Sequence, residues 1–353
     1  MGIPIVSVAF IIIVLRDCVF GGKTKTAGRN LAVCSALLLA AFFACRNGKV
    51  NFGSDLNNYY RFYLRAIHSS SFDRLAETST FEAGYVFLNY MFGRVIKWPQ
   101  FIIIFQAVFC IGVTVRFIYK HSKDVMLSVL GFMSLGLLQF YATGFRQSIA
   151  ISLCLIALEL AENRKLIPFI ITLLIASRIH QTSIVFAVSY ILVRLPVNRK
   201  TLAADITAVI VLPQLVPRII VMGNDVFDKS YGGSFAGNLT GGLINILIAG
   251  FIIFIMYKKF DAPDRDTCGI NYGFMHILII GIGIYAMRFQ ALVLERISLY
   301  FTPVMFILLP QVISSGFFND KDRALVRLLL CAGMLFLLFW RFSNLEFVPF
   351  WVQ

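Results

Sequence analysis

Apolar runs recur along the whole chain and are separated by short polar segments. A helix needs about 20 predominantly apolar residues to cross the hydrocarbon core of a bilayer. No stretch of ordinary amphipathic sequence is long enough to form a separate soluble domain. The pattern therefore predicts an all-α, polytopic membrane protein in which residues 1–353 form a single integral membrane domain.

The loops rich in Lys and Arg indicate the topology, because such loops stay on the cytoplasmic side of a membrane. Two helices, one crossing outward and one returning, fit between consecutive basic loops. Residues 31–119 are the exception, because they contain three apolar segments, and three crossings would leave the next basic loop on the wrong side. We predict that one of these segments, 81–98, is re-entrant or interfacial and does not cross the membrane. We then expect about twelve transmembrane helices, both termini outside, and two sizeable outside loops at about 46–80 and 223–238. The basic loops lie at 21–30, 120–124, 163–165, 194–200, 258–266 and 319–323.

A polar segment at 177–183, SRIHQTS, separates two short apolar runs. Helices of about 12 residues rise roughly 18 Å, which is less than the roughly 30 Å of a hydrocarbon core. This spacing predicts a short hairpin whose tip carries Arg178 and His180 to the floor of a water-filled recess. In the alternative, the helices extend through Glu162 and Arg194, and the tip lies among the lipid headgroups.

This topology places a set of charged residues at or near the same non-cytoplasmic surface. Charged groups that border a membrane are costly and usually face a cavity or a partner. Their convergence predicts one polar site on that side of the membrane. The residues are Asp55, Glu82, Arg146, His180, Arg288, Glu295 and Arg296.

Four arginines on that surface favour an anionic ligand, because a guanidinium binds phosphate oxygens through two parallel hydrogen bonds. They are Arg146, Arg178, Arg288 and Arg296. Each arginine taken alone is also typical of an interfacial anchor. A single arginine of this set can therefore be explained as an anchor at the membrane interface. The four together are better explained by an anionic ligand.

Two residues can serve as a base. His180 can take a proton from an alcohol near neutral pH. Glu82 begins the predicted re-entrant segment, and we rank it second because the hairpin tip presents His180. Asp55 lies in NFGSDLNNYYRFY, whose Asn and Tyr side chains suit sugar hydroxyls and rings.

Composition adds little further chemistry. The net charge of +14 fits the anchoring of cytoplasmic loops to anionic lipid better than nucleic-acid binding. The seven cysteines show no CxxC pair and no metal-ligand spacing. A D-x-D sequence at 264–266 is similar to a metal motif of nucleotide-sugar enzymes, but it lies in a predicted cytoplasmic loop, away from the other candidates. We predict no metal site and no cofactor.

Five short motifs follow one another in a characteristic order. This order resembles the EpsG-like branch of bacterial Wzy polymerases, which polymerise O-antigen and exopolysaccharide repeat units. The resemblance covers most of the chain, from about residue 50 to 310. The motifs are G-x-D-x-x-x-Y (Gly53, Asp55, Tyr59), E-x-G-Y-x-x-L-N (Glu82, Gly84, Tyr85, Leu88, Asn89), FRQSIA (Arg146, Gln147), A-S-x-I-H-Q-T-S (His180) and ERISLYF (Arg296, Tyr300).

The resemblance implies a metal-independent glycosyltransferase similar to GT-C-type membrane enzymes, in the bacterial inner (cytoplasmic) membrane, with its active site facing the periplasm. The donor would be a glycan on undecaprenyl pyrophosphate, and the acceptor a repeat unit on the same carrier. A glycosidic bond would form, and undecaprenyl pyrophosphate would leave. The implied partners are these lipid-linked glycans, the bilayer and a chain-length regulator protein, but no nucleic acid.

The hypothesis assigns a role to each motif residue. Catalysis falls to His180, Glu82 and Arg146, because arginines stabilise the departing pyrophosphate and a base accepts the acceptor's proton. Pyrophosphate binding is assigned to Arg146, Arg178, Arg288 and Arg296, and sugar binding to Asp55, Tyr59, Tyr85, Asn89, Gln147 and Tyr300. The alternatives are a flippase for the same lipid-linked oligosaccharide, an O-antigen ligase, and a membrane acyltransferase that would use His121.

Overall fold

The computed structural model describes residues 2–16, 24–49, 55–227, 239–260, 262–263, 268–343 and 347–352. Every named element in these ranges is a helix, so the all-α prediction is confirmed. An isolated antiparallel bridge between Arg46 and Pro349 joins the segment after the second helix to the end of the chain. Gly53, the D-x-D sequence at 264–266 and positions 228–238 of the second predicted outside loop lie outside the described residues.

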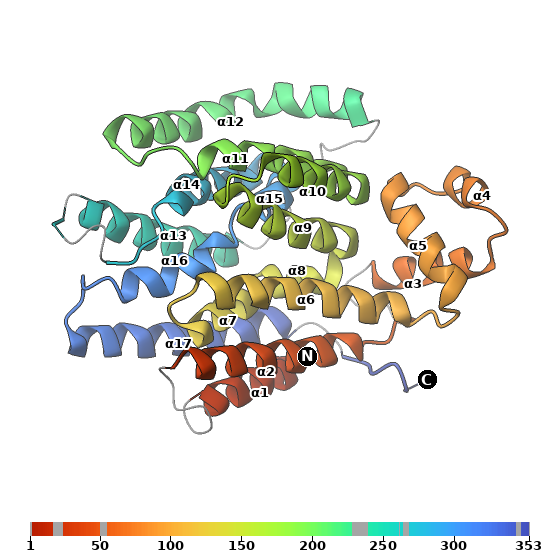
Figure 1. Ribbon diagram of the computed structural model, residues 1–353, viewed down its shortest axis with the longest axis horizontal. Helices are drawn as coiled ribbons and strands as arrows, with labels where there is room; N and C mark the ends of the chain where they lie inside the picture. The colour runs from red at the N-terminus through yellow and green to blue at the C-terminus, as the bar shows by residue number, and fades with distance from the viewer. Residues whose placement is uncertain are drawn as a thin grey trace.

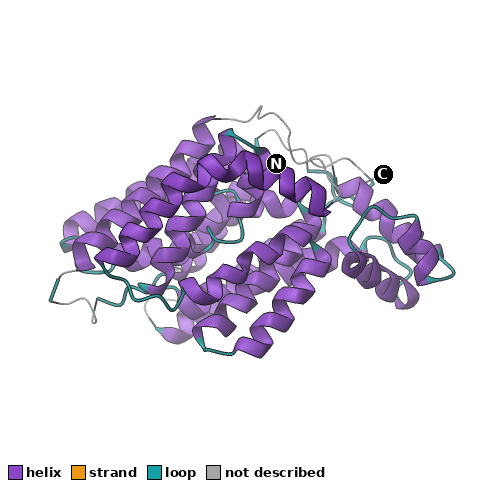
Figure 2. Ribbon diagram, turned by 90° about the horizontal axis from the view of Figure 1, so that it is seen from above, coloured by secondary structure: helices purple, strands orange, loops and turns teal. Residues whose placement is uncertain are grey.

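Most helices run side by side in one bundle, and a smaller group, α3 to α5, lies beyond one end of it (Figures 1 and 2). In the first half of the chain the helices are α1 (Gly2–Val14), α2 (Lys25–Ala44), α3 (Leu56–His68), α4 (Phe72–Glu77), α5 (Ala83–Val95), α6 (Phe101–His121), α7 (Val125–Ser134), α8 (Leu137–Thr143), α9 (Phe145–Glu162) and α10 (Leu166–Ile179). In the second half they are the 3₁₀ helix η2 (Gln181–Val188), α11 (Ser189–Leu192), α12 (Arg199–Phe227), α13 (Leu239–Phe260), α14 (Gly273–Ala286), the 3₁₀ helix η3 (Met287–Phe289), α15 (Leu292–Ser298), α16 (Val304–Ile313) and α17 (Asp320–Phe342).

Side-chain caps fix where several of these helices begin. The hydroxyl of Thr24 accepts a hydrogen bond from the Ala27 N–H at 3.1 Å, and the carboxylate of Asp124 accepts one from the Leu127 N–H at 3.2 Å. Such caps satisfy one of the four free N–H groups at a helix start. The polar residues between apolar runs therefore set the starts of the helices.

Four helices are long and apolar enough to cross a membrane: α2, α6, residues Gly242–Phe260 of α13, and α17. A fifth span results if α7 and α8, which are bent by 49° relative to each other, are counted as one. The bend lies at Gly136, whose φ of +104° is a left-handed conformation that glycine tolerates best. The structure therefore supports a helical membrane protein, but it does not confirm the prediction of about twelve spans.

The short hairpin predicted around 177–183 is present. Helix α10 has 14 residues, which is roughly 21 Å of helix, and it ends at Ile179. The chain reverses at His180, whose backbone is extended, and returns as η2 and α11. Helix α10 packs along α9, so the hairpin tip lies next to the start of the α9 segment.

The group of α3, α4 and α5 contains the segment predicted to be re-entrant or interfacial. Helix α5 has 13 residues, or roughly 20 Å of helix, so it is too short to cross a bilayer, in agreement with part of that prediction. Helix α3 packs on α5 through a buried face that includes Phe62 and Tyr63. Burial raises the pKa of Tyr63 to about 12, and its neutral hydroxyl donates to the Ile96 carbonyl at 3.0 Å.

Candidate active site

One end of the bundle brings together residues from four separate parts of the chain. The segment before α5 supplies Glu82, the start of α9 supplies Arg146, the hairpin tip supplies His180, and α15 supplies Arg296. A cavity of about 220 Å³ lies here, and Asp55, Tyr59, Thr143, Arg146, Gln147, His180 and Arg296 are among the residues that line it. We call it the central cavity. The predicted convergence of charged residues at one surface is therefore present for Asp55, Arg146, His180 and Arg296.

Glu82 connects the charged residues at this cavity. Its Oε2 accepts a charge-assisted hydrogen bond from the Arg146 guanidinium. Its Oε1 lies 3.4 Å from Nδ1 of His180 and 3.5 Å from the Gln181 N–H. The Glu82 side chain is only 4% exposed, so water screens these interactions little. The carboxylate therefore binds the guanidinium and lies within ion-pair distance of the imidazole at the edge of the cavity.

Gly84 explains how α5 reaches the hairpin tip. A Cβ atom at this position would lie 2.6 Å from the backbone carbonyl oxygen of Arg178, well inside van der Waals contact. The first turn of α5 can therefore approach the end of α10 only because residue 84 has no side chain. This close packing places Glu82, two residues earlier, against His180.

Arg146 is also held by neighbours that the sequence did not single out. Its guanidinium lies 4.5 Å from the centre of the Phe81 ring. Behind it, the fully buried Arg46 donates to the Ala142 carbonyl at 2.8 Å, and Gln106 donates to the Tyr141 carbonyl at 2.9 Å. These two bonds fix the end of α8, just before Arg146. In the sequence, Arg46 lies next to an apolar run and is typical of an interfacial anchor, so no local signal separates the two roles.

The aromatic rings of Tyr59 and Phe140 line part of the cavity. Tyr59 is stacked on Phe145 with ring centroids 4.9 Å apart and on Phe81 at 5.6 Å. Tyr59 lines the cavity together with Asp55 and Gln147. An aromatic face beside carboxylate and amide oxygens suits a sugar, which has apolar C–H faces and hydroxyl edges.

The other three residues predicted to bind sugar do not line the cavity. Tyr85, Asn89 and Tyr300 are almost completely buried. Asn89 donates to the Tyr85 carbonyl at 2.7 Å, and the hydroxyl of Tyr300 lies 2.9 Å from that of Thr182. The Tyr85 ring packs on Tyr59, and the Tyr300 contact reaches Thr182, just after the hairpin tip.

The structure separates the four predicted pyrophosphate arginines. Arg146 and Arg296 line the cavity, whereas Arg178 and Arg288 do not. The Arg178 side chain is exposed on the hairpin tip. Arg288 is buried, donates to the Tyr285 hydroxyl at 2.5 Å and pairs with Glu295 at 3.3 Å. Burial raises the pKa of the Glu295 carboxyl, and Arg288 opposes that rise.

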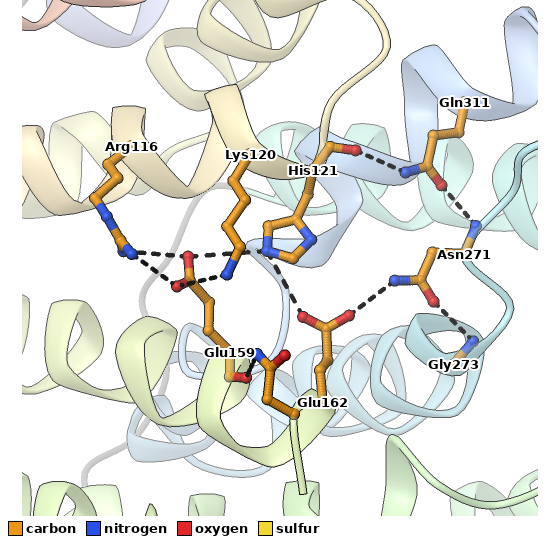
Figure 3. A network of polar contacts seen from close by, with 9 residues as sticks. Arg116, Lys120, His121, Glu159, Glu162, Asn271, Gly273 and Gln311 are labelled. Carbon is orange, nitrogen blue, oxygen red and sulfur yellow. Dashed lines mark hydrogen bonds and ion pairs between the residues drawn. The ribbon is translucent and has the colours of Figure 1, made fainter. Parts of the chain in front are cut away.

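A second polar cluster lies at the far ends of α6 and α9, away from the central cavity (Figure 3). Glu159 pairs with Arg116 at 3.0 Å and with Lys120 at 3.1 Å. His121 lies 3.8 Å from Glu159 and 3.6 Å from Glu162. The cluster extends to Asn271 and Gln311, which form hydrogen bonds to Glu162 and to the His121 carbonyl. It connects four segments of the bundle, and it includes the histidine that an acyltransferase would have required.

The chemistry available at the central cavity follows from this geometry. Arg146 and Arg296 present positive charge to an anionic group, and His180 offers a nitrogen that can accept a proton. Across the part of the chain that the structure describes, no group of three or more His, Cys, Asp or Glu side chains could hold a metal ion. The arrangement fits a transfer reaction with an anionic leaving group and an acceptor hydroxyl.

The model of the EpsG family matches residues 29–351, which is nearly the whole chain. No curated protein and no solved structure matches it.

Proposed function

We propose that this chain, which belongs to the EpsG family, is a membrane polysaccharide polymerase. It joins oligosaccharide repeat units carried on undecaprenyl pyrophosphate by glycosyl transfer, and it releases undecaprenyl pyrophosphate. The observation that carries this proposal is the contact of Glu82 with both Arg146 and His180 at the edge of a cavity that Arg296 also lines.

In this reaction, an acceptor hydroxyl attacks the anomeric carbon of the donor glycan. A new C–O glycosidic bond forms as the bond from that carbon to the pyrophosphate oxygen breaks, and the bonding electrons leave with the pyrophosphate. Arg146 and Arg296 stabilise the negative charge that grows on the leaving group. The hydroxyl proton goes to His180.

Glu82 prepares both groups for this step. Its carboxylate holds the Arg146 guanidinium in one orientation and favours the protonated imidazole that forms when His180 accepts the proton. Asp55, Tyr59 and Gln147 bind sugar at the cavity wall. In this proposal the pyrophosphate does not need Arg178 or Arg288.

The proposal also includes the membrane in which the enzyme lies, its orientation and its protein partner. The central cavity faces the periplasm, the chain lies in the inner membrane, and the shorter apolar helices complete a GT-C-like arrangement of about twelve membrane segments. A chain-length regulator is the expected protein partner. The convergence of Asp55, Arg146, His180 and Arg296 on one cavity supports an enzyme over a flippase. The charges at the far end of the bundle, around Glu159, are paired with one another.

The test is reconstitution. Purified protein in proteoliposomes is given lipid-linked repeat units extracted from cells that lack it, and products are separated on a gel in the presence of EDTA. We expect a ladder of polymers, with undecaprenyl pyrophosphate released in step. Movement of the lipid-linked unit across the vesicle membrane without a ladder would identify a flippase. A single transfer to a lipid A core, without a ladder, would identify a ligase.

A further inference from the structure

The central cavity is the first of three adjoining cavities. A second, of about 720 Å³, shares Asp55, Tyr59 and Arg146 with it. A third, of about 320 Å³, shares Arg65 with the second. The three follow α3 from the start of α9 to α4, at the end of the bundle where α3 to α5 lie (Figure 1). We call the three cavities together the cationic trough.

The charges in the trough have mostly one sign. Among its described lining residues are five arginines and two histidines, and Asp55 is the one carboxylate. The arginines are Arg61, Arg65, Arg74, Arg146 and Arg296, and the histidines are His68 and His180. A cleft lined by one sign of charge attracts and concentrates ligands of the opposite sign. Glu82 pairs with Arg146 at the central cavity, so the excess of positive charge lies in the second and third cavities, at Arg61, Arg65 and Arg74. This part of the trough favours an anionic occupant.

The outer face of α3 provides the positive charge beyond the reacting centre. Asn58, Arg61, Arg65 and His68 follow each other at intervals of three or four residues and are all exposed. Arg61 and Arg65 are one helical turn apart, and like charges at this spacing weaken a helix. Within the described ranges, neither guanidinium has an acidic partner at ion-pair distance. An occupant with negative charges would relieve this repulsion.

The second cavity also has surfaces that suit a carbohydrate. Tyr59 and Phe81 present aromatic rings, and Asn58 and Thr80 present an amide and a hydroxyl. Aromatic faces pack against the C–H faces of sugar rings, while Arg61 and Arg65 can each bind a carboxylate through two parallel hydrogen bonds. Their spacing along α3 is roughly 6 Å. The combination fits a sugar chain that carries negative groups.

We propose that the cationic trough binds the glycan itself through negatively charged sugars, so the repeat unit polymerised here is acidic. This inference rests on the proposed polymerase function and deepens it by naming the substrate class. The second cavity of the trough adjoins the central cavity, which holds Arg146, His180 and Arg296. The charged sugars of a bound chain would therefore lie beyond its reacting end.

The first test determines the charge of the substrate. Lipid-linked repeat units that accumulate in cells lacking the protein are released from the carrier and analysed by mass spectrometry and anion-exchange chromatography. We expect each unit to carry at least one carboxylate or another anionic substituent on a sugar. A ladder made from a neutral repeat unit would overturn this inference and leave the polymerase intact, whereas the absence of any ladder would overturn the polymerase itself.

The second test asks whether the arginines of α3 bind the negative charge of the repeat unit. In the reconstituted assay, Arg61→Gln and Arg65→Gln should each raise KM for the repeat unit roughly tenfold and leave kcat close to wild type, because each removes a charge-assisted contact. The control is Arg29→Gln, an exposed arginine on α2 at the opposite end of the bundle, which should change neither constant. With a repeat unit whose carboxylates have been reduced to alcohols, the α3 variants and the wild type should behave alike.

The same variants show whether the anionic ligand of α3 is the glycan or a lipid headgroup. The assay is run in vesicles of phosphatidylcholine alone and in vesicles that also contain anionic phosphatidylglycerol. We expect the loss in Arg61→Gln and Arg65→Gln to be the same in both. A loss that occurs only with phosphatidylglycerol would show that α3 binds membrane lipid and would overturn the proposal.

Discussion

Nδ1 of His180 lies 3.4 Å from Oε1 of Glu82, and the other oxygen of the same carboxylate binds the Arg146 guanidinium. The carboxylate precedes α5, and the imidazole is on the tip of the α10 hairpin. One buried acid thus joins the proposed base to the group proposed to stabilise the leaving pyrophosphate. Any change that separates α5 from the hairpin should therefore disturb both functions together.

Arg146→Lys should lower the polymerisation rate by roughly 100-fold or more, because lysine keeps the charge but cannot form a planar two-point contact with phosphate while it also binds Glu82. The measurement is the rate of ladder growth in proteoliposomes. Arg29→Lys serves as the control. Near-normal rates in both Arg146→Lys and Arg146→Ala would remove Arg146 from the mechanism.

His180→Ala should lower the rate by about 10²-fold to 10⁴-fold, the range typical of a lost general base. Imidazole added to the buffer should restore part of the activity, since His180 lines a cavity that can admit it. Glu82→Ala should lose activity that imidazole does not restore, because Arg146 also loses its partner. The matched control is His121→Ala, because His121 lies at the end of α6 that is far from the central cavity. Each rate is normalised to the amount of folded protein. If imidazole rescued Glu82→Ala and not His180→Ala, the two roles would have to be exchanged.

Gly84→Ala should reduce polymerisation strongly although it changes no charge. The added methyl group would overlap the Arg178 backbone and move α5 away from the hairpin, so Glu82 would lose His180. Gly112→Ala is the control, because a Cβ atom at Gly112, within α6, meets nothing within 4 Å. That variant should leave the rate unchanged and raise helix stability by about 0.5–1 kcal/mol. Equal activity of the two variants would contradict the close-packing argument.

Glu159→Gln should destabilise the fold and leave the chemistry unchanged. The Glu159 side chain is 8% exposed and pairs with Arg116 and Lys120. Loss of its charge should cost about 1–3 kcal/mol of unfolding free energy, measured as a lower midpoint of thermal unfolding in detergent. Asp320→Asn, which removes an exposed pair with Arg323, should cost less than about 0.5 kcal/mol. A lower rate per folded molecule in Glu159→Gln would mean that the cluster at the far end takes part in turnover.

The sequence by itself determined the class of structure. Apolar runs predicted an all-helical membrane protein, and SRIHQTS between two short runs predicted the hairpin and its polar tip. The motif order predicted the EpsG family, which the family match confirms. These features are encoded locally, because hydropathy, helix length and motif identity can each be assessed within one segment.

Only the tertiary structure decided which residues meet. Glu82 and Arg146 are 64 positions apart, and their contact depends on how closely α5 packs on the α10 tip at Gly84. Arg296 lines the cavity whereas Arg288 pairs with Glu295, although both arginines have the same charge and lie close to each other in the sequence. The span count also depends on breaks such as Gly136, where a backbone conformation divides an apolar run. Pairing and bending arise from contacts between distant segments, so no pattern within one segment could specify them.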